Sequence, residues 1–419
     1  MREVLRAHRR AVLEPAAETG PQDPATADSG LTRQAELAMR DGRDASRGVP
    51  QGPAAPGDAT DDAVCRLAGA CYLALRTGDP AHLPLQPAAA VLDRSGLAGM
   101  HANLCQHLGV ASDRATLIRG MQLSAVNTIR WNALASLLVS LESEDGIAPV
   151  LFKGGALHAR WPLMRELRAL ADYDLIVPQE QANALREALA RRGFASASPG
   201  SWLTRRLAKG WMACKGSGNA YQNLDVHARV TEPPVCNSLT RDILGTDARA
   251  SGIRVPGLED CVCMIALHVV RSGMHRPLRE YIDLLWYVDD LDDAGWQALR
   301  SRAARHQLLP ALFLSLRQAR HCLALDALAP GRAASLAART ASLEADVDSL
   351  RRRAIDWLAP PDYPLHPVAR RNRPGFRRSL ILGTGTSSAW RVAAAFALYG
   401  ASRLGDALSG AQPSTAAMD

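Results

Sequence analysis

The spacing of hydrophobic positions changes twice along the chain, which predicts two helical regions on either side of a sheet-forming core. From 61 to 145, apolar residues recur at steps of three and four, as on the buried face of helices, and Met121 to Leu141 is the longest such run. Short apolar runs suited to strands follow between 146 and 256, and helical spacing returns from 257 to 358. We therefore expect an α+β protein with a small mixed β-sheet core flanked by N-terminal and C-terminal helical regions.

The first half of the core reads as a strand, a glycine turn, a helix and a second strand. The apolar run Val150 to Phe152 is of strand type, and Lys153-Gly154-Gly155 interrupts it. Helical spacing then runs from Ala156 to about Leu170, before a strand from Asp172 to Val177. Because side chains in a strand alternate between its two faces, Asp172 and Asp174 are expected to point the same way.

A third strand is predicted over 221–230, where apolar and polar positions alternate strictly. Leu224 and Val226 alternate with Asp225 and His227, so the polar set is expected to share one face of the sheet. Such alternation is typical of a strand with its apolar face on the core and its polar face in a site. Three further elements are expected, namely a helix over 180–192 and strands over 211–214 and 253–256.

The two ends of the chain differ from the rest in composition. Residues 1–60 are rich in Ala, Pro, Gly, Asp and Arg, and we expect them to be disordered and dispensable for folding. Residues 359–419 read as a Pro- and Arg-rich linker followed by a C-terminal helix. The apolar run from Val392 to Ala401 is too short to span a bilayer, so no membrane span is expected.

Charge and cysteine content narrow the class of protein. The formal net charge is +7, but only three of the 49 basic residues are lysines, and the arginines are scattered rather than gathered in one stripe. We therefore expect no nucleic-acid partner. The eight cysteines show neither C-x-x-C spacing nor a zinc-type cluster with histidine, which predicts reduced thiols and a cytoplasmic protein.

The candidate chemistry lies in the carboxylates of the core strands. Two carboxylates held close together repel each other unless a cation lies between them, and Mg²⁺ prefers oxygen ligands of this kind. Asp172 and Asp174 on one strand, with Asp225 on another, therefore predict a metal site beside the glycine turn. A D-x-D pair alone is weak support, because acids at exposed strand starts often only face solvent.

The order of these motifs resembles the family of uncharacterised nucleotidyltransferases within the DNA polymerase β-like superfamily. The matching residues are Phe152-Lys153-Gly154, then Arg168, and then the strand from Asp172 to Val177. Ala171 stands where the family commonly has Gly, and Tyr173 where it commonly has Ile, but neither departure removes a ligand. The resemblance covers roughly residues 95 to 300.

The resemblance implies a metal-dependent transfer of NMP from an NTP such as ATP to an acceptor hydroxyl. It implies a catalytic and metal-binding role for Asp172, Asp174 and Asp225, and His227 is a further candidate whose alternative is an ordinary sheet position. The nucleotide phosphates would meet Lys153, Gly154, Gly155 and Arg168, although a structural ion pair is an equal alternative for Arg168. The implied cofactor is Mg²⁺, with Mn²⁺ as the alternative.

Two other functions remain open at this point. One is a transferase that uses the same metal platform on a phosphorylated or sugar-phosphate substrate, and the other is a nucleotide-binding module without catalysis. The acceptor is unidentified and is expected to be a small molecule, a peptide or a protein. If the three carboxylates only repel one another, replacing Asp174 with Asn should leave stability unchanged or slightly raised.

Overall fold

The structure is a computed structural model that describes most of the chain between residues 59 and 347. The described ranges are 59–84, 86–110, 113–197, 210–217, 221–230, 237–271 and 277–347. Residues 1–58 lie outside them, so the expected N-terminal disorder stays a prediction. The same holds for the expected linker and helix over 359–419.

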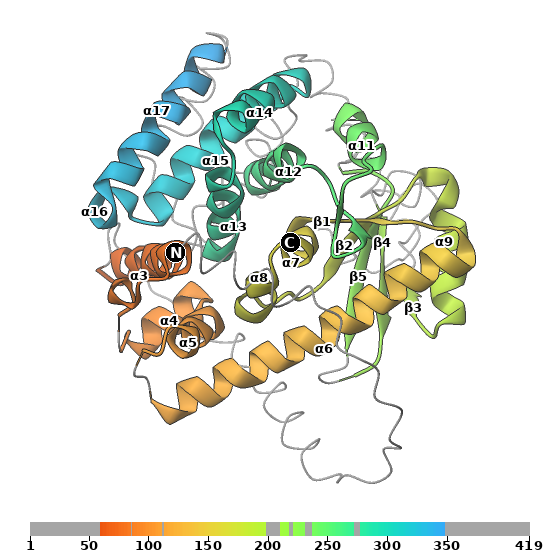
Figure 1. The fold of residues 1–419 in the computed structure, drawn as a ribbon, viewed down its shortest axis with the longest axis horizontal. Coiled ribbons are helices and arrows are strands. Elements are labelled where there is room, and N and C mark those ends of the chain that lie inside the picture. The colour runs from red at the N-terminus through yellow and green to blue at the C-terminus, as the bar shows by residue number, and fades with distance from the viewer. Residues whose placement is uncertain are drawn as a thin grey trace, which may run out of the picture. The chain divides into compact units, whose positions relative to one another are not determined.

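The core of the described chain is a five-stranded mixed sheet, as predicted, with the order β1-β2-β5-β4-β3. Its strands are β1 (Val150–Phe152), β2 (Tyr173–Ile176), β3 (Ala195–Ala197), β4 (Gly210–Lys215) and β5 (Gln222–His227). Strands β2 and β5 run parallel, and the other neighbouring pairs run antiparallel. The α+β fold with helical regions before and after the sheet is therefore confirmed (Figure 1).

The strand predicted over 253–256 does not join this sheet. Only Ile253–Arg254 forms a strand (β7), and it pairs antiparallel with β6 (Arg249–Ala250) in a separate two-stranded sheet. The bend between them contains Gly252, whose φ of 77° suits glycine. The apolar run is thus too short, and too close to its own hairpin partner, to reach the main sheet.

The N-terminal helical region consists of α3 (Ala59–Thr77), η1 (Pro80–His82), α4 (Ala89–Ser95), α5 (Ala98–His107) and α6 (Arg114–Asp145). The long helix α6 delivers the chain to β1. Its start is fixed by Asp113, whose side chain accepts a hydrogen bond from the backbone N–H of Thr116 at 2.9 Å. It ends at Gly146, which adopts a left-handed φ of 65°.

The single helix predicted over 156–170 is two helices, α7 (Lys153–Arg160) and α8 (Pro162–Leu167). Pro162 has no backbone N–H and cannot continue a helix, but it is well suited to the first position of a new one. The predicted turn at Lys153-Gly154-Gly155 is also wrong, since these residues form the first turn of α7.

After the second strand, the chain continues through η2 (Gln179–Gln181), α9 (Ala182–Arg191) and, beyond β5, α11 (Asn237–Leu244). The C-terminal helical region consists of α12 (Leu258–Arg271), α13 (Leu278–Asp289), α14 (Asp293–Arg305), α15 (Leu309–Cys322), α16 (Leu325–Leu328) and α17 (Pro330–Asp346). None of the helices in the described part of the chain combines the length and hydrophobicity that a membrane crossing needs.

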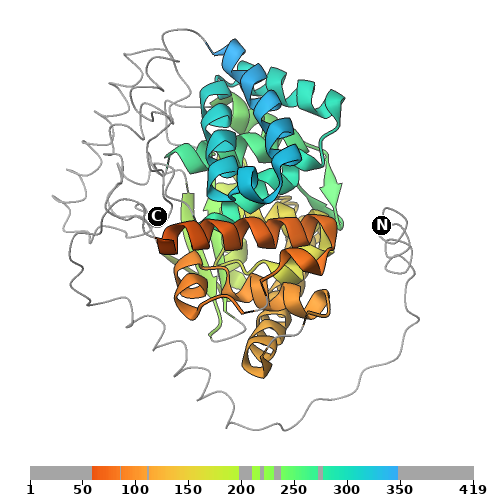
Figure 2. The ribbon, with the colours of Figure 1, turned by 90° about the vertical axis from the view of Figure 1, so that its left-hand side faces the viewer.

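Helix α3 joins the two helical regions. It contacts α4 and α5 on one side and α13, α15 and α16 on the other, and Figure 2 shows it between these groups. Tyr72 of α3 donates a hydrogen bond to Asp289 of α13, which also forms an ion pair with Arg332 of α17. Residues more than 200 positions apart are therefore packed together, and α13 is held against the rest of the described chain.

Candidate metal and nucleotide site

The strand register places two of the predicted aspartates side by side. Asp174 of β2 is opposite Asp225 of the parallel neighbour β5, and Phe152 of β1 is opposite Asp174 on the other side. Asp174 is buried, with 7% of its surface exposed, whereas Asp225 is half-buried. The predicted arrangement of Phe152, Asp174 and Asp225 on adjacent strands is thus present.

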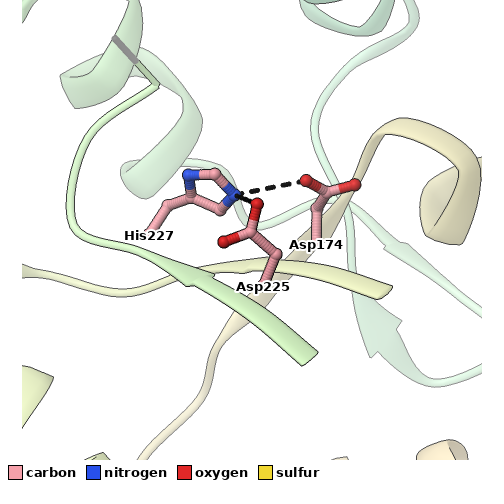
Figure 3. A group of neighbouring side chains, drawn as sticks. All are labelled: Asp174, Asp225 and His227. Carbon is pink, nitrogen blue, oxygen red and sulfur yellow. Dashed lines mark hydrogen bonds and ion pairs between the residues drawn. The ribbon is translucent and has the colours of Figure 1, made fainter. Parts of the chain in front are cut away.

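His227 completes a compact group with these two aspartates. It lies two positions after Asp225 on the same face of β5, and its ring is fully buried. Its Nε2 lies 2.9 Å from Asp225 Oδ2 and 3.2 Å from Asp174 Oδ1. Figure 3 shows the imidazole nitrogen facing both carboxylates. One ligand atom from each of Asp174, Asp225 and His227 lies within 4.8 Å of the others, which could hold a metal ion.

Asp172 lies beside this group rather than within it. It precedes β2, which begins at Tyr173, and it is not one of the three residues whose ligand atoms converge. Burial, and then the charge of Asp174, raise the pKa of the Asp172 carboxyl above its ordinary value. Asp225 adds to this effect, so Asp172 is close enough to feel both carboxylates. Its predicted role as a metal ligand stays a prediction.

Lys153 is the cation that faces the carboxylates. Its Nζ lies 2.5 Å from Asp174 Oδ1, the same oxygen that faces His227. Burial alone would raise the pKa of Asp174, but the Lys153 ammonium and His227 together hold it well below its ordinary value. Lys153 also has a φ of 49°, which is unusual for a residue other than glycine. A strained backbone at the sheet-to-helix junction therefore accompanies the contact of the Lys153 ammonium with Asp174.

The two glycines after Lys153 are required by close packing. A Cβ atom at Gly155 would lie 2.4 Å from Leu151 Cδ1. One at Gly154 would lie 2.4 Å from Leu170 Cδ2 and 2.9 Å from Arg168 Nη1. Phe152, the residue before α7, makes no side-chain capping hydrogen bond, so it leaves the first N–H groups of the helix without an acceptor at that position. The glycines let this first turn pack directly on its neighbours.

Arg168 is held in a buried ion pair with Asp283 of α13, which is not part of the group formed by Asp174, Asp225 and His227. Its Nη2 lies 2.6 Å from Asp283 Oδ2, and its Nε donates to Asp283 Oδ1 at 2.8 Å. The exposed fractions of the two side chains are 7% and 5%. The backbone oxygen of Arg168 accepts a hydrogen bond from His158 Nε2 at 2.8 Å. The ion-pair alternative is thus what the structure shows, and a direct phosphate contact by Arg168 stays a prediction.

Helix α13 also brings charges that the sequence did not single out. Arg279 adds to Lys153 in opposing the net rise in the pKa of Asp172. Glu280 adds to Asp174 and Asp225 in raising the pKa of Lys153 against the effect of burial. Glu280 is itself buried, and its Oε2 lies 3.9 Å from His268 Nε2 of α12. A spaced apolar pattern marks α13 as a helix but cannot show that its first turn faces strands more than 50 positions earlier.

Comparison with protein families then identifies the chain. The family model described as uncharacterised nucleotidyltransferase matches residues 86–324, more than half of the chain, and includes every candidate residue described above. The chain belongs to this nucleotidyltransferase family. It is therefore an enzyme of the nucleotidyltransferase class, as the order of motifs had predicted.

Two other comparisons add little to this assignment. A comparison of the sequence with functionally curated proteins finds no match. Among solved structures, the chain is similar to the antibiotic-resistance factor ANT(2'')-Ia, with 18% identity and a TM-score of 0.31. That similarity covers 43% of this chain and 95% of the other. A likeness this weak carries no information about the substrate of the present nucleotidyltransferase.

Proposed function

We propose that this nucleotidyltransferase is metal-dependent and transfers NMP from an NTP to a hydroxyl, or a similar nucleophile, of a small molecule, a peptide or a protein. The observation that supports this proposal best is the convergence of Asp174, Asp225 and His227 around one point on adjacent parallel strands. The cytoplasmic location remains the prediction made from the cysteine pattern.

The donor set suits a hard or borderline divalent cation. Asp174 and Asp225 offer carboxylate oxygens, which Mg²⁺ prefers, and His227 offers an imidazole nitrogen, which Mn²⁺ accepts more readily. Asp172 would add a further carboxylate on the same side. A cation held here would lower the pKa of the attacking hydroxyl and neutralise charge on the leaving pyrophosphate. We propose Mg²⁺ as the cofactor, with Mn²⁺ as the alternative.

The chain's own residues would do the remaining work by position and charge. The half-buried Asp225 is the best candidate to accept the proton of the acceptor hydroxyl, because it is the most accessible carboxylate of the convergent group. Lys153 would turn its ammonium toward a phosphate oxygen. The uncapped first turn of α7, at Gly154 and Gly155, would offer backbone N–H groups to the triphosphate.

Thermal unfolding tests this proposal without knowledge of the acceptor. The wild type should gain stability when Mg²⁺ is present with one of ATP, GTP, CTP or UTP, by about 2.7 kcal/mol at a hundredfold excess over Kd. Asp174→Asn should show no such gain, because it lacks a charged ligand. Without nucleotide, the variant should be less stable than the wild type, since Lys153 loses its buried counter-charge. From carboxylate repulsion alone, Asp174→Asn is expected to leave stability unchanged or slightly raised. Because of the contact with Lys153, we expect the substitution to lower it.

Asp145→Asn is the matched control for this experiment. Asp145 also pairs with two cations, Arg191 and Arg192, but these pairs join α6 to the region of α9. This variant should keep the full gain with Mg²⁺ and nucleotide. If Asp174→Asn gains as much as the wild type, Asp174 is not a ligand and the proposed site is wrong. Incubation with labelled NTP then separates NMP transfer from binding without transfer.

A further inference from the structure

We propose that Asp283 is a positioning residue for the nucleotide site, which it serves by fixing Arg168 beneath the first turn of α7. The inference rests on the proposed function, in which that turn faces the triphosphate. It assigns the C-terminal helical region a direct part in shaping the site. In this view α13 is more than a helix that covers the core.

The first support is the geometry of the ion pair between the two residues. Asp283 contacts Arg168 with both carboxylate oxygens, at 2.6 and 2.8 Å, so the guanidinium plane is fixed as well as its place. The backbone oxygen of Arg168 is held separately by His158 of α7. Burial lowers the pKa of His158 to about 3, so this ring stays neutral and donates from Nε2. Arg168 is therefore fixed at both its backbone and its side chain.

The second support is the close packing of Arg168 against the glycine turn. Its Nη1 and Cζ would lie 2.9 and 3.3 Å from a Cβ atom at Gly154, which is possible only because glycine has none. This Nη1 is buried, and no described residue accepts a hydrogen bond from it. Asp283 binds two of the three guanidinium nitrogens, Nη2 and Nε, and so holds the third, Nη1, against Gly154. A shift of the guanidinium toward Gly154 would therefore displace the first turn of α7, and a shift away would remove its packing support.

The third support is the pattern of charges on α13. Arg279, Glu280 and Asp283 lie on adjacent turns of one helix, and each acts on an opposite charge near the site. Arg279 acts on Asp172, and Glu280 acts on Lys153, while Asp283 pairs with Arg168. Six residues after Asp283, Asp289 instead pairs with Tyr72 and Arg332, away from the sheet. The start of α13 is thus directed at the site and its end at the other helices.

A double substitution separates positioning from simple stabilisation. Arg168→Met/Asp283→Leu replaces the buried pair by apolar side chains, which is often neutral or stabilising for the fold. A purely structural pair would tolerate this change. We expect instead that the variant melts at or above the wild-type temperature but binds its Mg²⁺·NTP about 10 to 100-fold more weakly, as when other supporting residues around a site are lost. Isothermal titration calorimetry with the NTP that stabilises the wild type best measures this.

Two single variants complete the design. Asp283→Asn should weaken Mg²⁺·NTP binding by at least about tenfold and also lower the melting temperature, because Arg168 keeps a buried charge without a full partner. Asp289→Asn on the same helix should lower the melting temperature while binding remains within about twofold of the wild type. Equal binding losses in Asp283→Asn and Asp289→Asn would overturn the inference.

Hydrogen exchange without nucleotide keeps the inference testable apart from the proposed function. Peptides covering α7 should exchange about tenfold faster in Arg168→Met/Asp283→Leu than in the wild type, because the first turn loses its support. The same peptides should be unchanged in Asp289→Asn. Unchanged exchange in the double variant would overturn the positioning role, even if nucleotide binds. A wild type that binds none of the four Mg²⁺·NTPs would overturn the proposed function, and with it the link from Asp283 to the triphosphate.

Discussion

Two groups of charges in this nucleotidyltransferase contain similar residue types but differ in balance. The site group consists of Asp174, Asp225, His227 and Lys153. A second group, which we name the α14 cluster, consists of Asp242, Asp260, Arg302, Arg305 and His306. Each includes two aspartates and one histidine, yet the α14 cluster has two arginines where the site group has one lysine.

The difference indicates that charge balance, more than acid content, distinguishes the candidate site from a cluster of internal ion pairs. In the α14 cluster, Arg302 contacts both Asp242 and Asp260, at 2.9 and 3.1 Å, and Arg305 contacts Asp242 as well, so two arginines face the two aspartates, with Glu259 nearby as a further acid. In the site group, two carboxylates share one lysine, and Asp172 adds a third negative charge nearby. The surplus negative charge is what an external cation would neutralise.

The largest effect that would test this contrast is expected from Lys153→Met. Without metal, the variant should lose about 4 kcal/mol of unfolding free energy, because the buried Asp174 loses its ion pair with Lys153. Millimolar Mg²⁺ should then stabilise the variant more than the wild type, because the added cation takes over the charge. Chemical denaturation with and without Mg²⁺ measures both. Lys215→Met, at the exposed end of β4, is the control and should change little. If Lys153→Met is as stable as the wild type without metal, the site group does not carry the surplus negative charge that we infer.

A smaller, pH-dependent effect is expected from Asp260 in the α14 cluster. Burial raises the pKa of this carboxyl to about 6 from an ordinary 3.8, despite the nearby Arg302. The folded state therefore binds the proton more tightly than the unfolded state. The stability it contributes is fully present below 3.8 and is lost as the pH rises through 6, by about 3 kcal/mol. Asp260→Asn should remove this slope relative to the wild type, which denaturation at several pH values will show.

The smallest effect is expected from Asp242→Asn, which tests whether the α14 cluster takes part in metal binding. Its partners Arg302 and Arg305 are partly exposed, so the loss of unfolding free energy should be about 1 kcal/mol. The gain in stability with Mg²⁺ and nucleotide should equal that of the wild type. If Asp242→Asn instead loses this gain, the distinction between the two groups is wrong.

The alternation of residues along each strand predicted which side chains of the candidate site share a face. Strict alternation over 221–230 placed Asp225 and His227 on one face, and the strand after α8 placed Asp174 beside them. The same rule did not decide whether Asp172 or His227 would complete the convergent group. That depends on where β2 begins, and β2 begins one residue after Asp172.

Contacts between distant segments account for most of what the sequence did not predict. The glycines after Lys153 were expected as a turn, because no local pattern shows Leu151 and Arg168 packed against them. The partner of Arg168 lies on a helix 115 positions later, and nothing in either segment marks Asp283 as that partner. The break at Pro162 is the exception, because proline chemistry alone could have placed it.

The separation of Arg168 from Asp283 also has a consequence for the newly made chain. At a synthesis rate of about 5–20 residues per second, Asp283 leaves the ribosome roughly 6 to 23 seconds after Arg168. Strands β2 to β5 are made during that interval, while Arg168 still has no counter-charge to bury against. If Asp283 fixes Arg168 as proposed, the first turn of α7 reaches its final place only after α13 has been made, and the nascent chain then binds nucleotide only after that point.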